Sequence, residues 1–168
     1  MPLSLDPLQP SDFPLVAQLA DRIWRSHYAS MVPMAQIDYM LAGRYTSERL
    51  NTYLGSDQRW MHLLRKEEEA VGYCSHALTE RPGEMKLEQL YLLPGLHCQG
   101  LGGRMLDLVE AHARELGCRT LMLQVNKGNT GSIAVYRKRG FTVREEAVFD
   151  IGNGFVIDDY VMEKDLGA

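Results

Sequence analysis

The chain has 168 residues, of which 45% are hydrophobic and 24% are charged, and its formal net charge at pH 7 is −4. This length and apolar content predict one compact domain, residues 1–168, with a core of ordinary size. The negative balance argues against nucleic acid or an anionic membrane as the main partner, and it fits a small cationic molecule better.

The cysteines and the N-terminus indicate the cellular compartment of the protein. Cys74, Cys98 and Cys118 form no C-x-x-C pair and are odd in number, which favours neither a zinc site nor a disulfide scaffold. The five histidines show no metal-ligand spacing either, so no metal is expected. The N-terminus lacks the pattern of a signal peptide, and no apolar run approaches the ~20 residues of a membrane span. We therefore expect a soluble, cytoplasmic protein.

A short strand and a long helix are expected first. The alternating segment LSLDPL predicts a strand over residues 3–8. Apolar residues then recur at helical spacing over residues 13–28, behind the potential capping residues Ser11 and Asp12. Pro14 falls in the first turn, where a helix tolerates proline.

Two shorter helices are expected next. Apolar residues three and four apart predict helices over residues 34–45 and 47–55. Gly43 and Gly55 stand where these helices are expected to stop.

The middle of the chain predicts three consecutive strands. Segments 60–65 and 70–78 flank the charged turn KEEE, which is typical of a hairpin. Segment 85–94 gives a further strand after the turn TERPGE.

The C-terminal half predicts two helices and three strands. A glycine-rich start leads into an amphipathic helix within residues 97–117, and the apolar run TLMLQV predicts a strand buried on both faces. Asn129 is expected to cap a helix that stops at Gly140. Segments 141–149 and 155–163 then predict an antiparallel pair around DIGNG.

The element order is therefore β-α-α-α-β-β-β-α-β-α-β-β. Its strand-helix-strand crossover requires one parallel pair within an otherwise antiparallel sheet. The predicted fold class is α/β: a mixed, mostly antiparallel sheet of six to seven strands with one splayed parallel pair, flanked by helices. Ligands favour the carboxyl ends of the strands at such a switch.

The glycines in HCQGLGGRM indicate a phosphate site, since a helix N-terminus offers free backbone N–H groups and a partial positive charge. A nucleotide-hydrolase loop would need Lys and Ser or Thr after the last glycine, and here Arg104 and Met105 follow. A dinucleotide loop would need a third glycine where Met105 stands. Both of these classes are excluded.

Two signatures resemble the GNAT superfamily of N-acetyltransferases. Gly100, Leu101 and Gly102, after the strand LEQLYLLP, are similar to its acetyl-CoA loop Q/R-x-x-G-x-G/A. Asn129, Tyr136 and the pair GF at 140–141 resemble its second signature, and DDYVMEKDL resembles its last strand. The resemblance covers nearly the whole chain and implies a GNAT-like fold over residues 1–168. One departure is His97, which stands where the family usually has Gln or Arg.

The resemblance implies acetyl-CoA as the cosubstrate and no metal. Backbone groups of one strand end would pair with the pantetheine arm, the loop would hold the pyrophosphate, and the second signature would complete the cofactor site. Arg104 has an alternative as a solvent-facing side chain, and Asn129 as a plain helix cap. These implied cofactor-binding residues are Leu90, Tyr91 and Leu92; His97, Cys98, Gln99, Gly100, Leu101, Gly102, Gly103 and Arg104; and Asn129, Ser132 and Tyr136.

Acetyl transfer to an amine needs a base for the amine and a proton for the departing thiolate. Tyr136 is the candidate acid, the role of the matching tyrosine in the family, and the alternative is a half-buried aromatic on a helix face. Glu88, just before the cofactor segment, is the candidate base, acting directly or through water. Its alternative is a solvent-facing strand position.

The N-terminal half implies the acceptor side. Its pattern W-x-x-x-Y…Q-I-x-Y-M-L…Y resembles the bacterial group that includes polyamine (spermidine/spermine) N-acetyltransferases. Trp24 and Tyr28 are the candidate substrate residues, with Tyr39 and Tyr45 as further aromatic candidates, although core positions are the alternative for all of them. The acidic residues Asp150, Asp158 and Asp159 could attract a cationic amine.

The sequence thus predicts an acetyl-CoA-dependent N-acetyltransferase acting by direct attack in a ternary complex. Its acceptor would be the primary amine of a small molecule, polyamine-like or amino-acid-like. The alternatives are a protein N-terminal or lysine acetyltransferase and, from another class, a non-catalytic CoA-binding or regulatory domain. The resemblance also implies a homodimer that pairs through the late strands.

Overall fold

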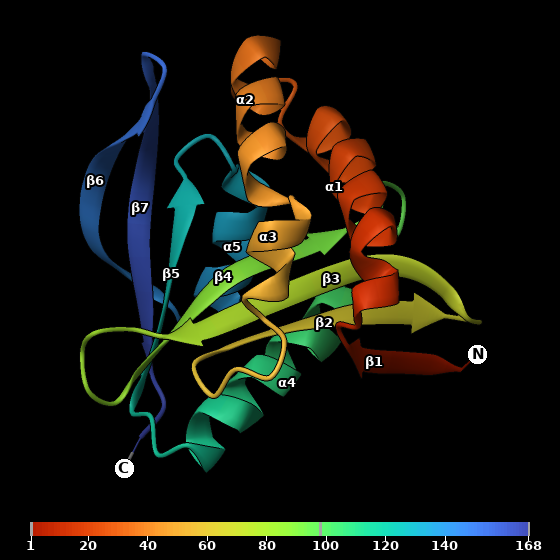
Figure 1. Cartoon of the computed structure of the whole chain (residues 1–168). Coiled ribbons are helices and arrows are strands. Elements are labelled where there is room, and N and C mark those ends of the chain that lie inside the picture. The colour runs from red at the N-terminus through yellow and green to blue at the C-terminus, as the bar shows by residue number, and fades with distance from the viewer. Residues whose placement is uncertain (1, 98, 168) are drawn as a thin grey trace. The chain divides into compact units, whose positions relative to one another are not determined.

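The structure is a computed structural model that describes residues 2–97 and 99–167. Its elements follow the predicted order, with one short 3₁₀ turn added before the first helix (Figure 1). In chain order they are β1 (Leu3–Pro7), η1 (Pro10–Asp12), α1 (Phe13–His27), α2 (Met34–Arg44), α3 (Ser47–Asn51), β2 (Arg59–Lys66), β3 (Glu69–Leu78), β4 (Glu84–Leu92), α4 (Leu101–Glu115), β5 (Thr120–Asn126), α5 (Thr130–Lys138), β6 (Thr142–Gly152) and β7 (Phe155–Asp165).

The strands form a seven-stranded sheet in the order β1-β2-β3-β4-β5-β7-β6. Strands β4 and β5 pair in parallel, from Glu84 opposite Thr120 to Leu87 opposite Leu123. The pairs β1–β2, β2–β3, β5–β7 and β6–β7 are antiparallel. The predicted mixed sheet with one parallel pair is therefore confirmed, and the helical crossover that this pair requires is α4.

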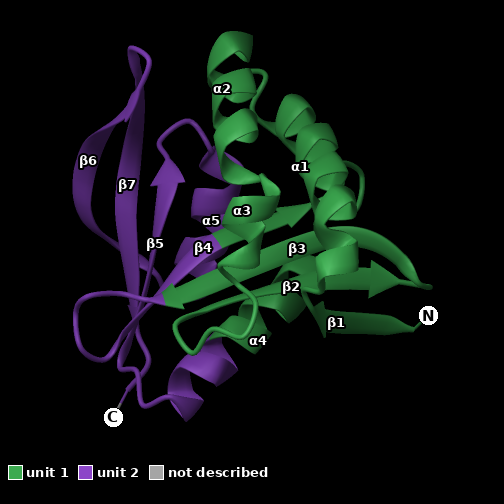
Figure 2. Ribbon diagram, in the orientation of Figure 1, with its two compact units in different colours: residues 1–77, 89–109 green, residues 78–88, 110–168 purple. Residues whose placement is uncertain are grey.

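The chain divides into two compact units (Figure 2). Unit 1 comprises residues 1–77 and 89–109, and unit 2 comprises residues 78–88 and 110–168. Strand β4 and helix α4 each contribute one part to each unit. The single domain over residues 1–168 stays a prediction.

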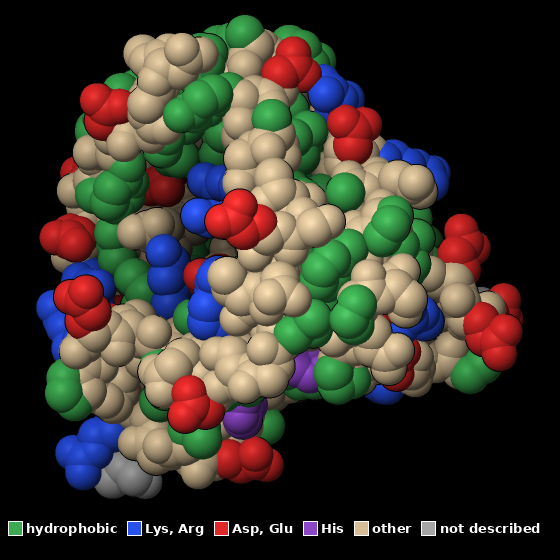
Figure 3. All heavy atoms as spheres, in the orientation of Figure 1, with side chains coloured by type: hydrophobic (Ala, Val, Ile, Leu, Met, Phe, Trp, Pro, Cys, Tyr) green, Lys and Arg blue, Asp and Glu red, His purple; other side chains and the backbone are tan. Residues whose placement is uncertain are grey.

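Figure 3 shows acidic and basic side chains interspersed over one face of the molecule.

In unit 1, helices α1 and α3 lie in front of β2 and β3 in the view of Figure 1, α2 lies above these strands, and the part of α4 that belongs to this unit lies behind them. The predicted hairpin between β2 and β3 turns through two glutamates, Glu67 at φ 53° and Glu68 at φ 72°. Such two-residue turns match the twist of the strands but favour Asn and Gly, since other side chains are strained at positive φ.

Three local predictions for unit 1 are wrong. Gly43 lies inside α2, which ends at Arg44, and α3 ends at Asn51, before Gly55. Asp12 does not cap α1 with its side chain. Its carboxylate instead accepts hydrogen bonds from the Gln9 backbone N–H at 3.0 Å and from Arg65 at 3.0 Å. A carboxylate that is bonded to an arginine of β2 and to the Gln9 backbone is no longer available to the helix.

In unit 2, the expected helix cap and closing hairpin are confirmed. Asn129 Oδ1 accepts a hydrogen bond from the Ser132 backbone N–H at 3.3 Å, and Gly140 follows the helix at φ 97°. The turn between β6 and β7 contains Asn153 at φ 56° and Gly154 at φ 79°, the residue pair that this turn type prefers.

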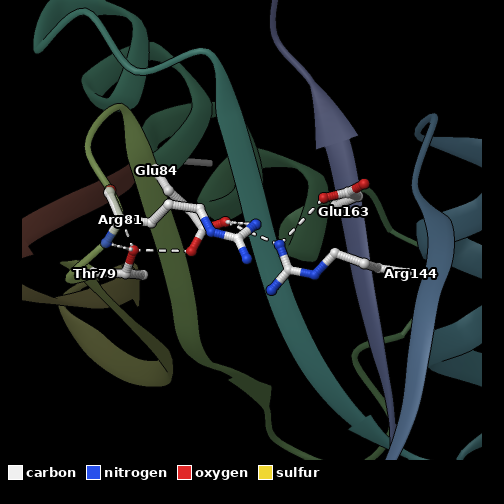
Figure 4. A network of polar contacts seen from close by, with 5 residues as sticks. All are labelled: Thr79, Arg81, Glu84, Arg144 and Glu163. Atoms are coloured by element: carbon white, nitrogen blue, oxygen red, sulfur yellow. Dashed lines mark hydrogen bonds and ion pairs between the residues drawn. The ribbon is translucent and has the colours of Figure 1, made fainter.

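A buried carboxylate on β4 joins this strand to β6 and β7 in unit 2 (Figure 4). Glu84 accepts hydrogen bonds from Thr79 Oγ1 at 2.8 Å and from Arg144 at 2.9 Å. Arg144 also reaches Glu163 at 3.2 Å, so residues from β4, β6 and β7 share one network. Pairing and hydrogen bonding satisfy the Glu84 side chain, which is only 6% exposed.

Candidate active site

The end of β4 is held close to β3 in unit 1 by a glycine. A Cβ atom on Gly72 would lie 2.6 Å from the Tyr91 carbonyl oxygen and 2.9 Å from Leu92 Cδ2. Just beyond, the Leu93 backbone N–H donates to the Val71 carbonyl at 2.9 Å. Gly72 therefore sets the position of the strand end that is predicted to bind the pantetheine arm. Sequence reasoning missed it, because only the strand register shows which residue it faces.

Side chains at this strand end divide between two helix layers. Leu90 and Leu92 lie against the first turn of α4, where a Cβ on Gly102 would meet them at 3.7 and 3.8 Å. Gln89 and Tyr91 contact aromatic residues from α1 and the end of α2. The end of β4 thus contacts the first turn of α4 with one set of side chains and the aromatic residues of α1 and α2 with the other.

Helix α4 begins as the phosphate hypothesis requires. Gly100 has φ 77°, and the Arg104 backbone N–H donates to its carbonyl at 3.1 Å. Leu101 and Met105 are buried and anchor the helix, and the N–H groups of a first helical turn have no intrahelical partners. The side chains of His97, Gln99 and Arg104 are exposed, and Gly103 is half-buried. Cys98 lies outside the described residues.

An aromatic cluster brings the two predicted substrate residues together with a predicted cofactor residue. The Trp24 ring lies 5.0 Å from Tyr28 and 5.6 Å from Tyr91, centroid to centroid, and the Arg44 guanidinium lies 5.3 Å from its centroid. The Tyr28 and Tyr91 hydroxyls are 3.1 Å apart. Trp24 is buried and Tyr28 is half-buried, so Tyr28 is the one of the two with accessible surface. Tyr39, on α2, is exposed.

A chain of hydroxyl groups continues from this cluster. The Tyr45 and Tyr73 hydroxyl oxygens are 2.6 Å apart, and Tyr45 donates to Gln89 Oε1 at 3.0 Å. Burial raises the pKa of both phenols well above 10, so both stay protonated at neutral pH. Sequence reasoning missed Tyr73 and Gln89, which no spacing pattern connects to Tyr45.

Unit 2 holds the second predicted signature. Asn129 is buried, Ser132 and Tyr136 are half-buried, and the Tyr136 ring packs edge-on against Phe141 at 5.6 Å. The Phe141 backbone N–H donates to the Tyr136 carbonyl at 3.0 Å. The start and the end of this short helix are therefore both fixed by named contacts.

A second buried carboxylate in unit 2 fixes the end of α5 to β7. Glu110 is 6% exposed and forms ion pairs with Arg139, at 2.9 Å, and with Lys164. The Arg139 backbone N–H donates to the Tyr136 carbonyl at 3.0 Å. The ion pairs of Glu110 thus join α4 to the residue that follows α5 and to β7.

The acidic candidates of unit 2 differ in their surroundings. Glu88 is half-buried on β4. Lys127 binds Glu146 at 2.8 Å and Asp158 at 2.9 Å, and these hydrogen bonds raise the lysine pKa. Asp158 therefore shares the positive charge of Lys127 with Glu146, while Asp150 is exposed and Asp159 is buried.

The described cysteines are unsuited to nucleophilic chemistry. Cys74 and Cys118 are free and buried, and burial raises the pKa of the Cys74 thiol to about 12. A thiol is nucleophilic only as thiolate. Within residues 2–97 and 99–167, no cluster of His, Cys, Asp and Glu has the make-up of a metal site, and no helix is long and apolar enough to cross a bilayer.

Comparisons with known proteins agree on one family. The model of the Acetyltransferase (GNAT) family matches residues 19–141. An uncharacterised N-acetyltransferase of Mycobacterium tuberculosis is 31% identical over 72% of this chain and 76% of its own length. A mycothiol acetyltransferase of Segniliparus rotundus is 31% identical over 63% of this chain and 43% of its own length.

A solved structure gives the same fold. The crystal structure of the PaiA N-acetyltransferase from Thermoplasma acidophilum, in complex with coenzyme A, superimposes with a TM-score of 0.82 and 20% identity, over 98% of this chain and 99% of that one. The expected GNAT-like fold and enzyme class are confirmed: the chain belongs to the GNAT family of acetyltransferases.

Proposed function

We propose that this acetyltransferase transfers the acetyl group of acetyl-CoA to the primary amine of a small molecule by direct attack in a ternary complex. The observation that supports acetyl-CoA as the acetyl donor is helix α4, which begins directly after Gly100 and packs against the end of β4 through Gly102. Its first-turn N–H groups suit a pyrophosphate, and the PaiA structure of the same fold contains coenzyme A.

The donor is assigned to residues of unit 1. Backbone groups of Leu90, Tyr91 and Leu92 would pair with the pantetheine arm. The loop from His97 to Arg104 would hold the pyrophosphate mainly through backbone N–H groups, which makes a histidine acceptable at position 97. Asn129 and Ser132 of unit 2 are proposed as further cofactor-binding residues.

The chemistry is assigned to Glu88 and Tyr136. Glu88 takes a proton from the ammonium group, directly or through water, because an alkylammonium has a pKa near ~10 and cannot attack while protonated. The amine nitrogen then forms a bond to the thioester carbonyl carbon, and the C–S bond breaks. Tyr136 donates its phenolic proton to the departing thiolate, and the second proton of the nitrogen, which the amide does not keep, returns through water to the Tyr136 phenolate.

The acceptor is proposed to be polyamine-like or amino-acid-like. The aromatic cluster around Trp24 and Tyr28 supports an amine with an apolar part. The relatives include acetyltransferases named for different acceptors, so the acceptor of this chain is proposed from its own residues. We further propose that the protein works in a reducing cytoplasm, where Cys74 and Cys118 stay free. We also propose that it forms a homodimer.

Thermal unfolding tests the donor site. At 1 mM acetyl-CoA the Tm should rise, because a ligand that binds only the folded state stabilises it. Gly102→Ala should keep this rise, since the added Cβ meets Leu90 and Leu92 at ordinary contact distance. Gly102→Glu should abolish it by placing bulk and negative charge in the loop. No rise in the wild type would overturn the proposed donor.

A further inference from the structure

The direction of the hydroxyl chain in unit 1 follows from burial. The Tyr73 side chain is fully buried, and Tyr45 is the hydrogen-bond partner that the described residues give its hydroxyl. A buried O–H needs an acceptor, so Tyr73 donates to Tyr45. Tyr45 has one hydrogen of its own left, and it donates that hydrogen to Gln89 at 3.0 Å.

This direction fixes the orientation of the Gln89 amide. Only the amide oxygen can accept from Tyr45, because the amide nitrogen carries two hydrogens and accepts none. Both phenols remain protonated at neutral pH, so the orientation does not change with pH there. The Oε1 atom is therefore committed to Tyr45, and the two N–H groups of Nε2 are left as donors.

The N–H groups of Gln89 Nε2 lie in a half-buried position that a ligand could reach. Gln89 is half-buried and shares its strand end with Tyr91, whose ring contacts Trp24 and Tyr28. Among residues 2–97 and 99–167, the structure gives Nε2 no hydrogen-bond partner. A donor in a half-buried place favours a ligand that brings an oxygen atom to it.

We propose that the Gln89 amide is a specificity-determining donor that selects primary amines carrying a hydroxyl or carbonyl oxygen near the amino group. The inference rests on the proposed acetyl transfer and narrows its acceptor to amino-acid-like or hydroxylated amines rather than plain polyamines. The thioester carbonyl of acetyl-CoA is a second possible source of the same oxygen chemistry, and the test separates the two.

The test uses matched amines that differ in one oxygen function. 1,3-Diaminopropan-2-ol is compared with 1,3-diaminopropane, and L-phenylalaninamide with phenethylamine, by following release of the CoA thiol. The wild type should prefer the oxygen-bearing member of at least one pair by about tenfold in kcat/KM, the effect of one hydrogen bond. An equal kcat/KM within both pairs would overturn the inference.

Three variants assign the preference to the amide. Gln89→Met removes donor and acceptor, whereas Gln89→Glu keeps an oxygen for Tyr45, loses the donor and adds a negative charge that acts alike on both members of a pair. Gln89→Met should lower kcat/KM about tenfold for the oxygen-bearing amine and leave its partner within about twofold, and Gln89→Glu should remove the preference within the pair. Tyr45→Phe releases the amide and should cost about threefold, again on the oxygen-bearing amine alone.

Other outcomes have separate meanings. An equal loss on both members of a pair would mean that the amide serves the thioester or the fold, and it would overturn the inference. An unchanged rise in Tm with acetyl-CoA shows that each variant is folded. If the wild type binds acetyl-CoA but releases no thiol with any amine, the proposed function fails and the inference fails with it.

Discussion

Gly72 lies so close to Tyr91 that a Cβ atom on it would come within 2.6 Å of the Tyr91 carbonyl oxygen. The two residues belong to neighbouring segments of unit 1, and the contact is to backbone, which cannot rotate away. The strand end predicted to hold the pantetheine arm is therefore positioned by the absence of a side chain.

Gly72→Ala should displace this strand end. We expect a loss of about 2 kcal/mol in the free energy of unfolding and about tenfold weaker binding of acetyl-CoA, because small displacements of a binding group are costly. Urea unfolding and a binding titration measure the two effects. Gly43→Ala is the matched control: its Cβ would meet nothing within 4 Å in the helix α2, and it should stabilise by up to ~1 kcal/mol. Unchanged acetyl-CoA affinity in Gly72→Ala would contradict the assigned role.

Tyr136→Phe tests the proposed acid. The variant keeps the aromatic ring that packs on Phe141 at 5.6 Å and loses only the hydroxyl. We expect kcat to fall about 100-fold with little change in the KM for acetyl-CoA, since general acid catalysis contributes to the transition state alone. Tyr160→Phe, which removes a hydroxyl from a half-buried ring on β7, should leave kcat unchanged. Full activity of Tyr136→Phe across the pH range would remove Tyr136 from the mechanism.

Glu88→Gln tests the proposed base through its pH profile. Neighbouring side chains on a regular strand point to opposite faces. Because Gln89 is proposed to contact the acceptor, Glu88 would point away from it, and we expect the proton to pass from the amine to Glu88 through water. At pH 7 the variant should be about 100-fold slower, and it should approach the wild type near pH ~10, where the amine loses its proton unaided. A loss of the same size at every pH would indicate a structural role instead.

The turn between β2 and β3 offers a prediction that is independent of catalysis. Glu67 and Glu68 both have positive φ, at 53° and 72°. Replacing them by Asn and Gly should stabilise the protein by about 1 kcal/mol, because these residues tolerate that backbone conformation better. Thermal unfolding should show a Tm higher by several degrees. A lower Tm would mean that the glutamate side chains make contacts that outweigh the strain.

Local signals were sufficient for much of the fold. The apolar run of β5, the Asn129 cap and the Gly140 stop are each encoded within a few residues, and the structure confirms them. Where a distant residue competes, local reasoning failed: Arg65, 53 positions away, takes the carboxylate of Asp12 that was expected to cap α1. A helix can also run through a glycine, as α2 does at Gly43.

The candidate site shows the same division. The glycine loop and the Asn129 to Phe141 signature are continuous in sequence and could be found there. The contact of Gly72 with Tyr91 joins residues 19 positions apart. The chain from Tyr73 through Tyr45 to Gln89 joins residues 28 and 44 positions apart. No period or motif links such residues, so only the folded structure brings them together.

The central claim, acetyl transfer from acetyl-CoA to a small primary amine, is tested most directly by amine-dependent release of the CoA thiol. Purified protein with acetyl-CoA and an amine panel should release thiol in proportion to the amine consumed and yield the N-acetylated product by mass spectrometry. Acetyl-CoA binding without any amine-dependent thiol release would contradict the claim and favour a regulatory CoA-binding domain. Release with peptides alone would shift the acceptor to a protein N-terminus or lysine.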